Sequence, residues 1–127
     1  MPGSDWLRDE LTKYIFTTEA MGTRPAAWYV ALFKADGTEV DGTDDANYSR
    51  QSVAFSTYAT GRARNDAVVS FPAAEAGADY EVTHWGVYTD ASAGEELIKQ
   101  ELEFSRQVSD EDVISFAPND LIVGIGG

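Results

Sequence analysis

The chain is built from short apolar runs separated by turns rich in glycine, aspartate, asparagine and proline. About seven or eight such runs follow one another at nearly regular spacing between residues 27 and 125. Parallel strands need long crossover connections, so short strands joined by short turns are typical of antiparallel sheets. The sequence therefore predicts a mainly β fold, either an antiparallel β-sandwich or a jelly roll, with one short amphipathic helix at the N-terminus.

Residues 80–104 predict a β-hairpin at the centre of the sheet. Residues 80–89 alternate in the manner of a strand, with Trp85 and the only histidine, His84, on opposite faces. Small polar residues then form a turn, and residues 96–104 alternate again, with Ile98, Leu102 and Phe104 on one face. Each face of the first run mixes apolar and polar side chains, and no catalytic arrangement stands out.

Residues 27–34 are apolar on both faces, which is unusual for a strand with one side in water. Such a strand lies between two packed layers or at an interface.

Residues 5–17 predict the N-terminal helix. Ser4 or Asp5 can cap it, and the acidic residues come early while Lys13 comes late, as the helix dipole favours. The helix is expected to end near residues 16–17, ahead of a segment with glycine and proline. Two alternatives are open: it packs on its own sheet, or it docks onto a neighbouring subunit.

Composition limits the class of protein. The 127 residues suffice for a single domain, 1–127, and no apolar run approaches the ~20 residues that span a bilayer. There is no signal-peptide pattern, so we expect a soluble protein made in the cytoplasm. The absence of cysteine excludes disulfides, thiolate zinc sites and thiol nucleophiles.

The chain is strongly acidic, with 22 Asp and Glu against 9 Lys and Arg and a net charge of −13. Such a surface repels nucleic acid and anionic membranes, so neither is expected as a partner. Salt screens the repulsion among the carboxylates, which would suit a halophilic habitat. The alternative is an ordinary acidic surface with an arginine-over-lysine bias.

No motif points to an enzyme, and we predict no catalytic, cofactor-binding or metal-ligating residues. A single His without a nucleophile elbow supports neither a triad nor a zinc site, and no phosphate-binding glycine loop is present. The acidic loop 36–45 offers oxygen ligands, but it does not match a calcium-binding EF-hand loop and reads as a solvated loop. Arg62 and Arg64 lie in a loop-like segment, where they are either solvated or paired with acidic patches on a partner or another copy.

The order of several short motifs resembles a family of small structural proteins of tailed viruses. The motifs are WYVALF at 28–33, YSRQ at 48–51, VSFP at 69–72, VTHWGVY at 82–88 and DEDVISF at 110–116, followed by DLIV at 120–123. Members are described as tail-fibre-like, minor tail or head decoration proteins. Two departures from the family pattern occur in turns: residues 34–37 lack a proline, and charged residues stand at 95–96.

The resemblance implies a non-enzymatic virion protein of a bacteriophage or archaeal virus. We expect a decoration or cement protein on the capsid exterior. The alternative is a tail-associated protein, a minor tail or fibre module, with glycan binding through Tyr48, Tyr58 and Trp85 as an added option. The expected partners are further copies of the chain, as a homodimer or homotrimer, and the major capsid protein or tail proteins.

More apolar surface is present than a small sandwich needs to close its core. The excess lies on the helix and on the second face of residues 28–33, and we expect it to meet another subunit. The candidate interface consists of Trp6, Leu7, Leu11, Tyr14, Ile15 and Trp28, with Arg62 and Arg64.

Overall fold

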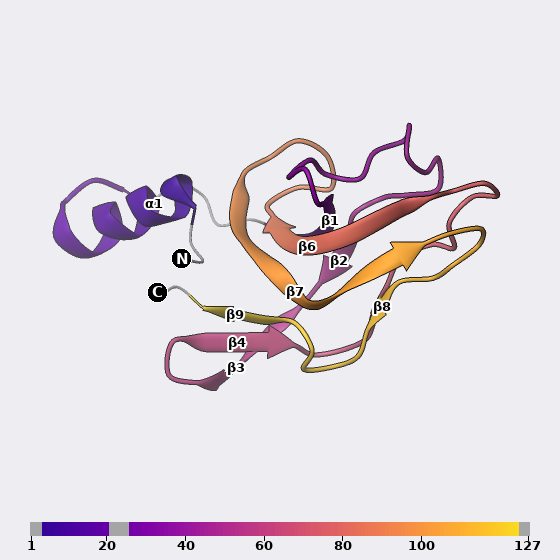
Figure 1. The fold of residues 1–127 in the computed structure, drawn as a ribbon. Coiled ribbons are helices and arrows are strands. Elements are labelled where there is room, and N and C mark those ends of the chain that lie inside the picture. The colour runs from indigo at the N-terminus through magenta and orange to yellow at the C-terminus, as the bar shows by residue number, and fades with distance from the viewer. Residues whose placement is uncertain (1–3, 21–25, 125–127) are drawn as a thin grey trace.

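The computed structural model describes residues 4–20 and 26–124, apart from the side chain of Tyr58. Within these ranges the chain forms one helix and nine strands, which confirms the mainly β prediction (Figure 1). The elements are α1 (Asp5–Phe16), β1 (Trp28–Lys34), β2 (Gln51–Val53), β3 (Phe55–Ala59), β4 (Arg62–Asn65), β5 (Val69–Ser70), β6 (Tyr80–Tyr88), β7 (Glu96–Val108), β8 (Ser115–Phe116) and β9 (Ile122–Gly124).

The largest sheet has four antiparallel strands in the order β2-β1-β6-β7. β6 and β7 form the predicted hairpin, with β6 inside the sheet and β7 at its edge. Val30 faces Val87 and Leu32 faces Trp85 across the β1–β6 pair, so large apolar side chains meet on one face. All four are buried in the core.

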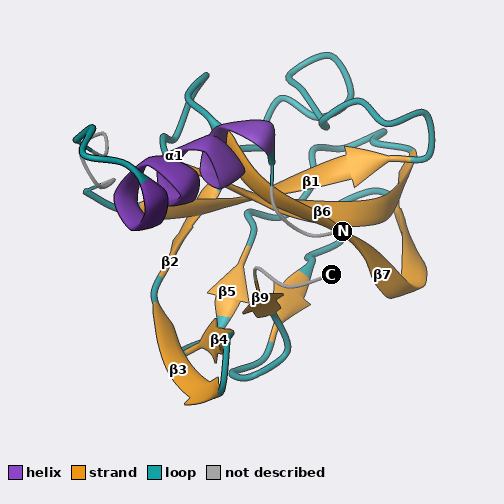
Figure 2. Ribbon diagram, turned by 90° about the vertical axis from the view of Figure 1, so that its left-hand side faces the viewer, coloured by secondary structure: helices purple, strands orange, loops and turns teal. Residues whose placement is uncertain are grey.

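Two smaller antiparallel sheets, β3-β4-β9 and β5-β8, form a second layer beneath that face (Figures 1 and 2). Val69 and Phe116, paired across β5 and β8, join the core from this layer. The sheets have four, three and two antiparallel strands and lie in two layers, as the β-sandwich prediction expects.

The β6–β7 pair contains a bulge that the simple alternation does not reveal. Val82 pairs with Arg106 and His84 with Glu101, so residues 102–105 of β7 oppose only one residue of β6. The β1–β6 pairing shifts at the same place: Phe33 pairs with His84 and Lys34 with Val82, so Thr83 is an extra residue of β6. Both Val82 and Trp85 therefore lie in the core, although strict alternation puts them on opposite faces. Phe104, among the extra residues of β7, is 75% exposed. Bulges protect edge strands from pairing with other chains, and β7 is such an edge.

Part of the second face of β1 is covered by this chain itself, although Tyr29 on that face is only partly buried. Contact of this face with another subunit stays a prediction. Phe33 is buried and stacks against Tyr88, with ring centroids 6.2 Å apart. The amino group of Lys99 lies 4.2 Å from the centre of the Phe33 ring. Gly86 makes this packing possible, because a Cβ there would lie 2.9 Å from Phe33 Cε2.

Residues 58–65, expected to be loop-like, instead form most of the β3–β4 hairpin. β4 pairs with β3 on one side and β9 on the other, which places Arg62 and Arg64 on the central strand of the small sheet. Gly61 turns the hairpin with a φ of 72°, a conformation that favours glycine.

Asn65, at the end of β4, is fully buried and joins three segments of the second layer. Its Nδ2 donates to the carbonyl oxygens of Ala67 and Ala117, each at 2.9 Å. Its Oδ1 accepts from the backbone N–H of Leu121 at 2.9 Å. This side chain therefore ties β4 to the turns before β5 and β9.

Candidate interaction surface

Residues 4–20, here called the helical arm, begin with a capped helix. The Ser4 hydroxyl accepts a hydrogen bond from the Leu7 N–H at 3.1 Å, satisfying one of the free donors of the first turn. Asp5 lies in the first turn and Lys13 in the last, where each complements the helix dipole. The helix ends at Phe16, within a residue of the expected boundary.

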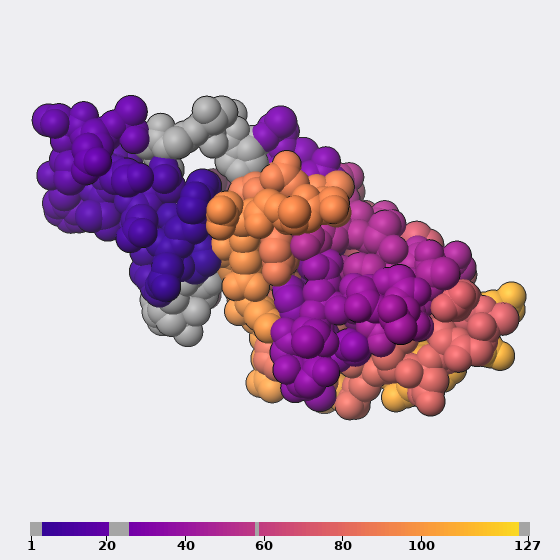
Figure 3. Space-filling model, turned by 90° about the horizontal axis from the view of Figure 1, so that it is seen from above, coloured from indigo at the N-terminus to yellow at the C-terminus, as the bar shows by residue number. Residues whose placement is uncertain are grey.

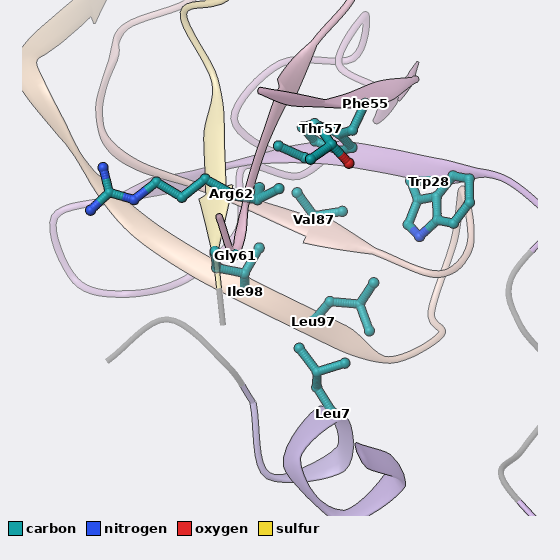
Figure 4. Close-up of a pocket in the computed structure, with 12 residues that line it drawn as sticks. Leu7, Trp28, Phe55, Thr57, Gly61, Arg62, Val87, Leu97 and Ile98 are labelled. Atoms are coloured by element: carbon teal, nitrogen blue, oxygen red, sulfur yellow. The ribbon is translucent and has the colours of Figure 1, made fainter. Parts of the chain in front are cut away.

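The arm is attached to the sheets by its beginning. The Ser4 N–H donates to the carbonyl oxygen of Leu97 at 2.9 Å, and Leu7 points toward Leu97 at the start of β7 (Figure 4). From there the helix projects beyond the strands, and in Figure 3 it forms one end of the molecule. The arm thus contacts its own sheet, but through one end only, and docking onto a neighbouring subunit stays a prediction.

Apolar side chains become more exposed along the arm. Trp6, Leu7 and Leu11 are partly buried near the sheets. Tyr14, Ile15 and Phe16, here called the arm tip, are 71%, 61% and 79% exposed. Three consecutive apolar side chains of this exposure are unusual for a surface and favour an interaction site.

An apolar groove of about 350 Å³ lies where the arm meets the strands (Figure 4). Seven elements contribute to it, including both layers of the fold. Its apolar walls include Leu7, Trp28, Phe55, Val87, Leu97 and Ile98.

Among the residues that the structure describes, Arg62 is the only charged one in the wall of this groove, in a chain with 22 acidic residues. The stem of Arg62 lies along the groove and its guanidinium extends past the edge (Figure 4). Arg62 is exposed and makes no ion pair with any described residue, whereas Arg64 on the same strand is partly buried. The groove is therefore an apolar site with one positive charge at its edge.

The structure brings together only part of the candidate interface. Leu7, Trp28 and Arg62 line the groove, while Tyr14 and Ile15 stand away from it at the arm tip.

Phe16 belongs to the arm tip although it lies off the apolar stripe of the helix, so periodicity does not select it. Phe55 and Leu97, also absent from the predicted set, come from separate strands, and only their assembly makes a wall.

A second polar cluster surrounds Arg50 and is structural. Its guanidinium pairs with Glu39 at 2.8 Å, and the hydrogen bond to Glu39 raises the pKa of Arg50. It also donates to the carbonyl oxygens of Asp90 and Ala93, which holds the β6–β7 turn. The ring of Tyr88 lies 3.8 Å from the Arg50 Cζ. Arg50 thus fixes two loops in place.

Tyr48 belongs to the same cluster. Its hydroxyl donates to Glu39 at 2.7 Å and accepts from the Leu32 N–H at 3.1 Å. Burial and the neighbouring carboxylate together hold the pKa of Tyr48 well above its usual range. With Tyr48 half-buried and Trp85 buried, the side chains proposed for glycan binding serve the core, and that of Tyr58 lies outside the described residues.

The remaining chemically interesting residues also serve local structure. His84 Nδ1 lies 2.8 Å from the hydroxyl of Thr83. In the acidic loop, Asp41 accepts from the N–H groups of the following turn, and Asp44 pairs with Lys34 at 3.0 Å. Among the described residues, no three His, Asp or Glu side chains are grouped to hold a metal ion.

Comparison with known proteins gives one clear result. The family model described as podophage GP4 fiber I protein gp80 matches residues 2–124, nearly the whole chain. No curated protein matches the sequence. Among the described helices, none has the length and apolarity that crossing a membrane requires.

Proposed function

Since the chain belongs to the podophage GP4 fiber I protein gp80 family, a family of tailed-virus structural proteins, we propose that it is a non-enzymatic component of a virion tail fibre. The observation that carries the proposal is the match over residues 2–124, because it includes both the arm and all nine described strands. The location that we propose is therefore the bacteriophage tail rather than the capsid exterior.

The use of polar side chains supports a structural role. Arg50, Asp44 and Asn65 each hold loops or turns through hydrogen bonds within the chain. The groove, in contrast, has apolar walls and a single charge, which suits the packing of a protein segment better than the activation of a substrate.

The family description favours the tail over the capsid-decoration function that we expected from the sequence. Both functions need a stable folded domain that attaches to the virion through a limited surface. The arm tip and the groove supply such a surface for either place. Glycan binding through Tyr48 and Trp85 loses its support, because both side chains are engaged in the core.

Labelling of intact virions tests the proposal. Antibodies raised against the purified protein, bound to gold and viewed by electron microscopy, will mark the tail and leave the capsid shell unlabelled. Antibodies against the major capsid protein provide the control for accessible capsid. Gold distributed over the capsid would overturn the tail proposal and favour the capsid-decoration hypothesis.

A further inference from the structure

The chain contains two complementary surfaces that do not meet each other. One is the arm tip of Tyr14, Ile15 and Phe16, and the other is the apolar groove beside Arg62. We propose that the arm tip of one copy binds in the groove of a second copy.

An arm tip cannot enter the groove of its own chain while the arm is attached. Leu7 already lines that groove. Phe16 lies about 13 Å farther along the helix, because each residue of a helix adds about 1.5 Å. The helix runs outward from the strands (Figures 1 and 3). Intramolecular contact would therefore require the Ser4–Leu97 hydrogen bond and the Leu7 packing to break.

Charge selects a second copy as the occupant. With a net charge of −13, most faces of two copies repel each other. The groove is an exception, since none of its described lining residues is acidic and Arg62 stands at its edge. The arm continues past its tip to the exposed Glu19, three residues after Phe16 and so within about 10 Å in an extended segment. A bound tip can thus place Glu19 beside Arg62.

A tip-to-groove contact joins two different surfaces. Copies joined in this way form either a closed assembly, which is a reciprocal pair or a ring, or an open filament. Each arrangement uses the same contact. It is also a property of the isolated chain, so it does not depend on whether the protein belongs to the tail or the capsid.

The first experiment measures self-association by sedimentation velocity over a range of protein concentrations. The wild type will associate, and the double variant Ile15→Ser/Phe16→Ser will do so about a hundredfold or more weakly, because two apolar side chains are no longer buried on binding. Phe104→Ser is the matched control: Phe104 is 75% exposed but lies on the β7 bulge, and its variant will associate like the wild type. Circular dichroism will show the same β signal in all three proteins.

The second experiment separates tip-to-groove from tip-to-tip contact. Arg62→Glu places like charge beside Glu19 and will weaken association about fivefold at low salt, and Glu19→Arg in the same chain will restore it. The tip variant, Ile15→Ser/Phe16→Ser, retains an intact groove. The groove variant, Arg62→Glu/Thr57→Trp, retains an intact arm tip, and its tryptophan also fills the groove. Mixed together, these two proteins will form a one-to-one complex although neither associates alone.

Three results would overturn the proposal. They are a monomeric wild type at every concentration, undiminished association of the folded tip variant, and no complex between the tip and groove variants.

Discussion

Replacing Asn65 by alanine will lower the free energy of unfolding by about 3 kcal/mol. The side chain is fully buried and makes three hydrogen bonds to backbone groups, all at 2.9 Å. The N–H of Leu121 belongs to a buried residue, and leaving it without a partner costs about 1–3 kcal/mol. Ala67 and Ala117 are exposed residues whose carbonyls can accept from water, so each lost bond costs only about 0.5–1.5 kcal/mol.

A loss of about 3 kcal/mol is a large part of the 5–15 kcal/mol that stabilises a typical domain, so it is easily measured by urea denaturation. The fluorescence of the buried Trp85 reports unfolding. Asn47→Ala is the matched control: Asn47 also donates from Nδ2 to a backbone carbonyl, that of Ala73 at 3.1 Å, but is exposed. Its loss will stay below about 1 kcal/mol. Equal losses of unfolding free energy for the two variants would refute the conclusion that the buried hydrogen bonds of Asn65 stabilise the second layer.

Three further perturbations test the packing and the charge. Gly86→Val will lower stability by about 1–3 kcal/mol, because its Cβ would lie 2.9 Å from both the Phe33 ring and a backbone carbonyl of β7. Gly42→Ala is the control, because a Cβ at Gly42 would have no atom of a non-neighbouring residue within 4 Å. An equal drop in the melting temperature of both variants would contradict the packing of Phe33 against Gly86. Burial raises the pKa of Tyr88 to about 12 and also raises that of Tyr48, so above pH 10 the unfolded chain loses phenolic protons that the folded chain keeps. Stability will therefore fall between pH 10 and about 12; ionisation of all six tyrosines at the ordinary pKa in the folded protein, measured by tyrosinate absorbance, would disprove this. Raising salt from about 0.1 M to about 1 M will raise the melting temperature, because screening weakens repulsion among the excess carboxylates, and an unchanged temperature would argue against it.

The elements that the sequence predicts correctly have local signals. The cap at Ser4, the apolar stripe and the position of Lys13 together place the helix within a residue of its observed end. The hairpin of β6 and β7 follows from two alternating runs around a small polar turn. Neighbouring residues alone determine these features, so they can be read without knowledge of the rest of the fold.

The features that the sequence does not reveal depend on contacts between distant segments. The extra residues 102–105 of β7 shift the pairing with β6, and only the paired strand shows the shift. Phe33 is buried because Gly86 leaves room for its ring and because Tyr88 and Lys99 pack against it. The β3–β4 hairpin has one local signal, Gly61 between two polar runs, but its strands lack an apolar face long enough to recognise.

The groove, too, could not be predicted from the sequence. Its walls come from seven elements spread over most of the chain, so its existence follows from the fold and not from any motif. Trp28 and Arg62 were selected from the sequence for their chemistry alone. The structure adds that they share one groove, and that Phe16 extends the arm tip.

The location of the protein in the virion tests the central claim most directly. Heads and tails separated from purified virions can be analysed by quantitative mass spectrometry, with the major capsid protein as the marker for heads. A tail-fibre component will be recovered with the tails, in a fixed ratio to other tail proteins. Recovery with the heads, in a fixed ratio to the major capsid protein, would contradict the proposal.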